Sequence, residues 1–116
     1  MKLEEMEMDE YKITAKTTDI TLKITQVGKD LDIIISGGVE HIDCVGIVTK
    51  NSYSINTIEN HREDDIIIPL AKKLSKLTDK TIVIKAGIHL DNITSDEIKS
   101  ILGCTEEILN IIINYI

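Results

Sequence analysis

The chain has no tryptophan, no phenylalanine and only three tyrosines among its 116 residues. Hydrophobic residues make up 42% of the sequence, and isoleucine is the commonest of them. Branched aliphatic side chains favour the pleated surface of a sheet. The composition therefore favours a sheet that carries helices over a helical bundle. A chain of this length can form one domain with a single core and is too short for two.

Basic residues are fewer than acidic ones. Arg62 is the only arginine, and the formal net charge is −7. An acidic chain without a basic stripe, and without paired aromatic side chains that stack on bases, is unsuited to nucleic acid or an anionic membrane. No apolar run reaches the length of a membrane span. We therefore expect neither nucleic acid nor membrane as a partner.

The N-terminal residues and the two cysteines both bear on the cellular location of the protein. The first ten residues are acidic, lack the apolar segment of a signal peptide and are expected to form a mobile arm. Cys44 and Cys104 lie far apart and belong to no paired motif, which predicts free thiols in a reducing compartment. We therefore expect a cytoplasmic protein.

Alternation of apolar and polar residues predicts strands at 10–17 and 19–27, and a turn at 28–30 leads into a strand at 31–36. Three consecutive isoleucines, residues 33–35, make that strand apolar on both faces, so we place it centrally, with helices on one side and more protein on the other. Further strands are predicted at 44–49, 52–55 and 81–88. The fold class is α+β, a mostly antiparallel sheet of five to six strands with two to three helices packed on it.

The first helix follows Asn60, a possible N-cap. Its apolar face is formed by Ile66, Leu70, Leu74 and Leu77, at helical spacing. Pro69 lacks an N–H group and clashes with the preceding turn. The helix is therefore either kinked at this proline or begins only at about Ile68.

Two more helices are predicted near the C-terminus. Thr94 and Glu97 have the spacing of a capping box, and Gly103 ends that helix. Thr105 is the predicted cap of a last helix, 106–115, which is apolar nearly all round. Such a helix needs cover on more than one side, and we expect a second copy of the chain to supply it in a homodimer.

Each of the three histidines lies at the boundary of a predicted element with an acid two or three residues away. The segment His41-Ile42-Asp43-Cys44 could hold a metal or a Cys–His nucleophile. No paired motif completes a zinc site, so a structural role for Cys44 and His41 is favoured, and no metal is expected.

The other two histidines allow similar alternatives. His61 and Arg62 at a helix start could bind an anion, although three acids follow them, or those acids could simply stabilise the helix end. His89 and Asp91 follow a strand, where ligand-binding groups often lie. A shared His–Asp surface could serve binding or acid–base chemistry, and catalysis is the less favoured use because no nucleophile or cofactor loop accompanies it.

Three segments of the chain carry a family resemblance. They are GxxHIxxVG at 38–46, HRED at 61–64 and AGIHLDNIT at 86–94, and the last is the most specific. Together they resemble the LpdD-like proteins, the small component of UbiD-type hydroxyarylic acid decarboxylases that act on gallate or vanillate. The resemblance runs from about Lys12 to Leu102. The chain departs from it at Arg62, where we expect lysine, and at Pro69.

The resemblance implies a non-catalytic accessory protein that helps to mature a prenylated-flavin-dependent decarboxylase, with a fold like that of proteasome assembly chaperones. Its partners would be a second copy and the UbiD-type large subunit, and its cofactor prenylated FMN. Gly38 and Gly87 would shape the backbone. The cofactor-binding residues that it implies are Gly38, His41, His61, Arg62, Asp64, His89, Asp91 and Asn92. The alternatives are an assembly chaperone for another oligomer, or a small lyase or isomerase that uses His–Asp pairs.

Overall fold

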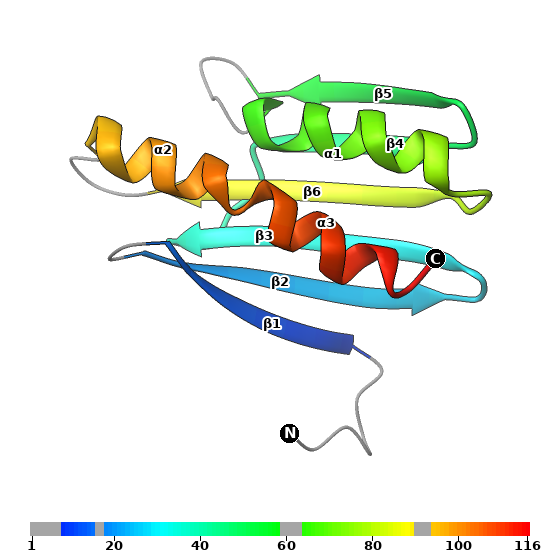
Figure 1. Ribbon diagram of the computed structural model, residues 1–116, viewed down its shortest axis with the longest axis horizontal. Helices are drawn as coiled ribbons and strands as arrows, with labels where there is room; N and C mark the ends of the chain where they lie inside the picture. The colour runs from blue at the N-terminus through cyan, green and yellow to red at the C-terminus, as the bar shows by residue number, and fades with distance from the viewer. Residues whose placement is uncertain (1–7, 16–17, 59–63, 90–93) are drawn as a thin grey trace.

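The computed structural model describes residues 8–15, 18–58, 64–89 and 94–116. These residues form one six-stranded sheet with three helices (Figure 1). The order of the strands across the sheet is β1-β2-β3-β6-β4-β5. The strands are β1 (Met8–Ala15), β2 (Thr18–Val27), β3 (Asp30–Gly38), β4 (Cys44–Thr49), β5 (Ser52–Thr57) and β6 (Ile82–His89).

The predicted α+β sheet is confirmed. β1, β2 and β3 form an antiparallel meander, β4 pairs antiparallel with β5 and β6, and only β3 and β6 run parallel among the described strands. The turn at 28–30 joins β2 to β3 as predicted, and β1 begins two residues before the predicted strand. β3 is a central strand, because it pairs with β2 on one side and β6 on the other.

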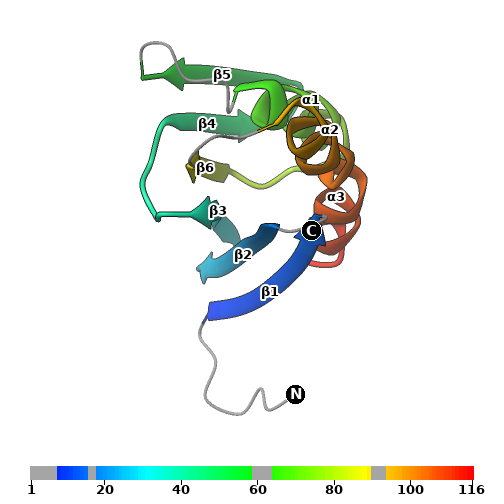
Figure 2. The same ribbon diagram turned by 90° about the vertical axis from the view of Figure 1, so that its left-hand side faces the viewer.

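All three helices pack on the same face of the sheet (Figure 2). They are α1 (Asp64–Leu77), α2 (Ser95–Gly103) and α3 (Thr105–Ile113). We call the opposite side of the sheet the open face, because none of the described helices lies on it. The predicted helical cover of β3 is thus confirmed. On its other side no described helix or strand covers it, and the connection from β3 to β4 lies near its last residues.

An aliphatic core fills the space between sheet and helices. Ile33, Ile35, Leu70 and Ile84 are completely buried there, as are most of the inward-facing residues of the central strands and of α1. Burying each such side chain stabilises the fold by about 1.5–3 kcal/mol. The core therefore depends on many small, similar contributions from branched side chains.

The structure corrects three details of the predicted helices. α1 begins at Asp64, so Pro69 lies inside it and the later start at about Ile68 is wrong. Leu77 is 58% exposed, because its position ends the helix beyond the edge of the core. Cys104, not Thr105, is the N-cap of α3, and no side chain caps that helix. The capping box of Thr94 and Glu97 is confirmed, and Asn60 lies outside the described residues.

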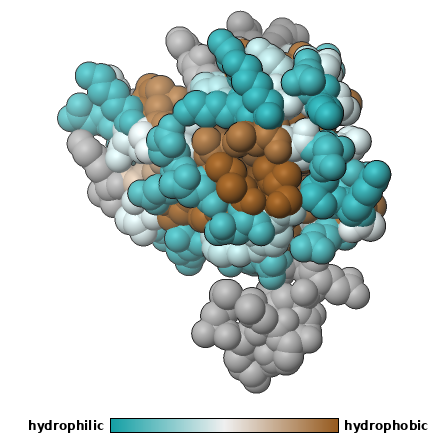
Figure 3. Space-filling view, turned by 45° about the vertical axis from the view of Figure 1, so that its right-hand side comes forward, coloured by the Kyte–Doolittle hydropathy of each residue, from teal (hydrophilic) through white to brown (hydrophobic). Residues whose placement is uncertain are grey.

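Much of the cover for α3 comes from the chain itself. Ile108, Leu109 and Ile112 are buried in the core, and α3 also contacts α1. Ile113 remains 39% exposed. Figure 3 shows apolar side chains gathered between hydrophilic ones on the side of the molecule turned toward the ends of α1 and α3. The chain thus supplies part of the cover that a second copy was expected to give, and the homodimer stays a prediction.

Two tyrosines connect the C-terminus to the edge strand β1. The Tyr115 hydroxyl donates to the Asp9 carboxylate and lies within hydrogen-bond distance of the Tyr11 hydroxyl, and the two rings meet edge to face. Burial, together with these two hydrogen bonds, raises the pKa of Tyr115 well above its usual range. This network holds the end of the chain against the start of the sheet.

We predict that Tyr115→Phe lowers the free energy of unfolding by about 1–3 kcal/mol, because Asp9 and Tyr11 lose a hydrogen-bond partner. A raised pKa means that the neutral phenol is favoured in the folded state. The contribution is therefore complete below about pH 10, the unfolded value, and is lost as the pH rises further. Urea unfolding at pH 8 and pH 11 measures both effects. Tyr53→Phe, at an exposed tyrosine, is the control, and equal stability of the two variants would contradict the prediction.

Candidate functional site

The connection from β3 to β4 passes over the end of β6, because β6 lies between these two strands. Its backbone touches β6 at Gly87, where an added Cβ would overlap the His41 carbonyl group. Gly87 is the register partner of Ser36 in β3, so both face the open side of the sheet. The Asp43 N–H donates to the Ala86 carbonyl at 2.9 Å and fixes the connection there. The crossing therefore requires glycine at residue 87.

The His41 ring is held by two acceptors. Its Nδ1 lies 2.8 Å from the Val39 carbonyl oxygen, and its Nε2 contacts the Asp43 carboxylate. A carbonyl can only accept a hydrogen bond and an ionised carboxylate likewise only accepts. Whichever ring nitrogen carries a proton therefore has an acceptor beside it. Asp43 is buried, whereas His41 is only half-buried.

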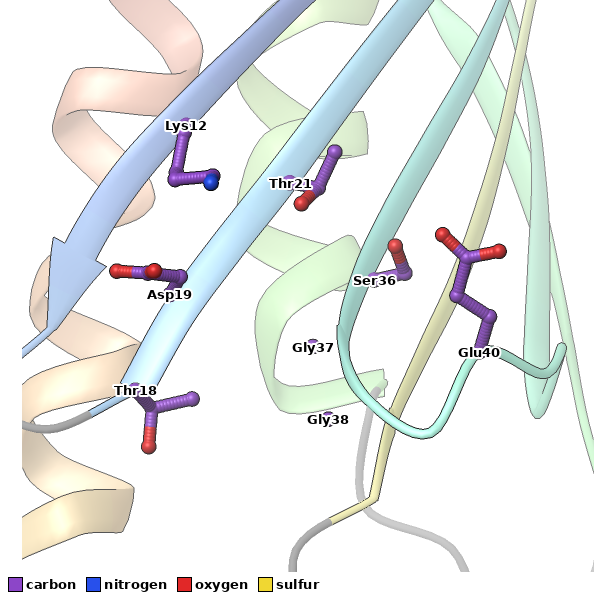
Figure 4. Close-up of a pocket in the computed structure, with 8 residues that line it drawn as sticks. All are labelled: Lys12, Thr18, Asp19, Thr21, Ser36, Gly37, Gly38 and Glu40. Atoms are coloured by element: carbon purple, nitrogen blue, oxygen red, sulfur yellow. The ribbon is translucent and has the colours of Figure 1, made fainter.

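A pocket of about 350 Å³ opens beside this connection on the open face (Figure 4). Its floor is a row of residues that are opposite one another in neighbouring strands, Lys12 on β1, Thr21 on β2 and Ser36 on β3. Gly37 and Gly38 close its end at the last residues of β3. Its volume lies at the lower end of the range of about 300–1,000 Å³ that is typical of small-molecule sites.

A second pocket of about 230 Å³ adjoins the first, and the two share Ser36 and Glu40. Its other lining residues include Ile34 on β3 and Ile42, which is 50% exposed. We call the two pockets together the groove. One half of the groove is lined with hydroxyl groups and Lys12, and the other half includes isoleucine side chains.

The two acids of the groove have partners of their own. Thr14 Oγ1 donates to Asp19 at 3.0 Å, and Lys23 Nζ lies 3.4 Å from the Glu40 carboxylate. Among the described residues, none forms an ion pair with Lys12. The groove therefore offers one ammonium group and several hydroxyl donors to an anion.

The structure brings together two of the three motif segments, the one at 38–46 and the start of the one at 86–94. Gly38, with φ of +67°, is the register partner of His89, the last residue of β6. The His41 backbone lies over Gly87, two residues earlier. A left-handed φ suits glycine, so the predicted backbone role of Gly38 has a physical basis.

The other predicted residues are only partly described. Asp64 is the first residue of α1. α1 follows β5, and the Thr57 end of β5 pairs with Cys44 near the groove. His61, Arg62, Asp91 and Asn92 lie outside the described residues.

Cys44 is the first residue of β4, and its side chain is buried. Its sulfur lies 3.7 Å from Thr57 Oγ1 and is buried in the core, whereas His41 contacts Asp43. Neither cysteine forms a disulfide bond, and burial raises the pKa of the Cys104 thiol. Within the described ranges, no group of His, Cys, Asp and Glu side chains could hold a metal. No described helix is long and apolar enough to cross a membrane.

Sequence reasoning missed the strand residues that line the groove. They are Lys12, Thr21 and Ser36 in the first pocket and Ile34 in the second. The alternation of β2 places Thr21 and Lys23 opposite the core side chains, so their face was predictable. Their neighbours across the sheet depend on strand register, which the alternation of single strands does not give.

A comparison with family models decides which family the chain belongs to. The model that describes a prenylated flavin chaperone LpdD-like domain matches residues 14–116. The chain belongs to the LpdD-like family. This match confirms the resemblance found in the sequence motifs, and all of the residues predicted as cofactor-binding lie within it.

Among solved structures, this LpdD-like chain is similar to a chain in the crystal structure of a novel chaperone complex for yeast 20S proteasome assembly. The TM-score is 0.58 at 9% sequence identity, over 95% of this chain and 98% of that chain. At such low identity the likeness concerns the fold alone, and it confirms the predicted similarity to proteasome assembly chaperones. No curated protein gives a significant match.

We predict that Gly87→Ala destabilises the protein by about 3 kcal/mol, because the new Cβ would overlap the His41 backbone and push the connection away from β6. The matched control is Gly103→Ala, where an added Cβ meets nothing within 4 Å, so this variant should be as stable as the original protein or up to about 1 kcal/mol more stable. Urea unfolding compares the two variants. A Gly87→Ala variant as stable as the control would show that the connection does not lie on β6.

Proposed function

We propose that this LpdD-like protein is a non-catalytic accessory protein that holds prenylated FMN and delivers it to a UbiD-type decarboxylase. The observation that carries this proposal is the groove on the open face, with one polar and one partly apolar half. Prenylated FMN has the same division, since a phosphorylated polyol chain is attached to a largely apolar ring system. The family match supports a flavin chaperone in general, and the choice of cofactor and partner is our proposal.

The polar half of the groove suits the phosphate end. Lys12 supplies a positive charge, and Thr21 and Ser36 supply hydroxyl donors from neighbouring strands. Charge-assisted hydrogen bonds of this kind are the strong ones for phosphate. The Glu40 carboxylate is paired with Lys23, and the Asp19 carboxylate, which accepts from the Thr14 hydroxyl, would face the anion across from Lys12.

The other half of the groove could hold the flavin ring system through aliphatic contacts, without aromatic stacking. Ile34 and Ile42 line it, and none of the three tyrosines lines either pocket. The His41 ring also lines this half of the groove. The bound group would supply the reactive centre of the decarboxylase, and the residues of this chain only hold and shield it.

The position of the groove is consistent with delivery. It lies on the face that no described helix covers, so a large subunit could approach the cofactor without displacing an element of the core. Ile42 and Ile47 on this side are 50% and 44% exposed. We propose that the apo-decarboxylase contacts this face, and the homodimer predicted from the sequence remains part of the proposal.

Among the described residues, the contact between His41 and Asp43 is a feature that favours an enzyme, because such pairs perform acid–base chemistry. An enzyme would turn over substrate in isolation and lose that turnover in a His41→Ala variant. A chaperone would instead increase the activity of the large subunit and have no turnover of its own.

We predict that Ser36→Leu abolishes flavin binding, because Ser36 is buried and lines both pockets. A leucine there would fill the junction of the groove. The protein is expressed together with a flavin prenyltransferase, and the purified protein is analysed by absorbance and native mass spectrometry. The original protein should carry a flavin mass, and the variant should carry about tenfold less or none.

Thr25→Leu is the matched control. It adds a leucine to the open face of β2, outside both pockets, so flavin binding should persist. If both leucine variants retained the flavin, the groove would not be the binding site. If the original protein carried no flavin, the cofactor part of the proposal would be wrong.

A further inference from the structure

β5 forms one edge of the sheet, since it pairs with β4 alone among the described strands (Figure 1). Its sequence, SYSINT, contains no charged residue and no proline. Five of its six residues are exposed. In an antiparallel strand, half of the backbone N–H and C=O groups point away from the one neighbour. β5 therefore presents a row of backbone donors and acceptors on its outer side.

The other edge of the sheet is different. β1 carries Asp9, Glu10 and Lys12 along its length, and charged side chains are a common device that prevents an edge strand from pairing with another chain. β5 has none of these protective features. An uncharged, exposed edge of this kind is a template for strand addition, in which an extended peptide joins the sheet.

A pocket of about 390 Å³ adjoins this edge on the helical side of the sheet. Tyr53 of β5 lines it together with Lys72 and Lys76, which are one turn apart on α1. The Asn51 N–H donates to the Ser75 carbonyl at 2.7 Å and fastens the β4–β5 turn to the helix. The strand and the two lysines are thus held at a fixed spacing.

The charge of this pocket contrasts with that of the chain. None of its six lining residues is acidic, although the protein has a net charge of −7. Lys73, which lies between the two lysines in sequence, is paired with Glu106, whereas no described acid forms an ion pair with Lys72 or Lys76. The two ammonium groups are therefore available to an anionic partner.

We propose that β5 is a docking site for an extended acidic segment of a partner protein, which adds to the sheet as a further strand and places carboxylates over Lys72 and Lys76. A peptide is favoured over other anions because the edge recognises backbone amide groups, which nucleotides lack. Alternate side chains of an added strand point to the helical side, where the lysines lie. This site is at the opposite end of β5 from Thr57, away from the groove, and does not depend on flavin binding.

The test uses a fluorescent six-residue peptide in which valine alternates with glutamate, and fluorescence anisotropy measures its binding to the full chain. We predict binding that weakens with added salt and falls by about tenfold or more in the double variant Lys72→Glu/Lys76→Glu. The matched control is Lys29→Glu/Lys99→Glu, which changes the net charge equally at exposed lysines outside the pocket and should bind like the original protein. Equal losses in the two double variants would overturn the proposal.

Two N-methylated versions of the peptide test strand addition itself. One is methylated at odd positions and the other at even positions, so only one version blocks the N–H groups that face β5. We expect one version to lose binding and the other to retain it. If both bound as well as the parent peptide, the attraction would be one of charge alone and the proposed strand addition would be wrong. If the peptide instead dissociated a dimer, with no effect of Lys72 and Lys76, a second copy would be the occupant and the proposal would be overturned.

Discussion

The crossing of the β3–β4 connection over β6 is the contact on which the candidate site depends. β6 enters the sheet between β3 and β4, so the chain must pass over one end of it. It passes on the open face and rests directly on Gly87. No side chain fits between the two backbones, and the connection is fixed from Val39 to Asp43. This places His41, Glu40 and Ile42 beside the row of residues from β1, β2 and β3.

The two faces of the sheet have different roles in this topology. The helices cover one face, and the branched aliphatic side chains beneath them supply the stability of the fold. The open face carries the groove, in which hydroxyl groups and Lys12 are followed by isoleucine side chains. A carrier of the proposed kind must release what it binds, and an open groove suits that need better than an enclosed cavity. The LpdD-like family match agrees with a chaperone role.

The edges of the sheet show a similar division. β1 is protected by charged residues and by the tyrosine contacts that hold the C-terminus against it. β5 is uncharged and lies beside two lysines of α1. A protein with these two edges can accept another chain on one side without aggregating through the other. The cofactor groove and the β5 edge would then serve different parts of one partner.

The sequence determined the strands, the helices and the chaperone family. Alternation of buried isoleucines is a local property of each strand, and the motif around His89 lies within a short segment, so both could be read directly. The sequence did not determine that Lys12, Thr21 and Ser36 form one row, or that His41 lies over Gly87. Those neighbours are set by strand register and by the insertion of β6 between β3 and β4, and they arise only when distant segments pair. Leu77 was placed on the apolar face of the first helix and is nevertheless 58% exposed, because helical spacing gives the direction of a side chain but not where the core ends.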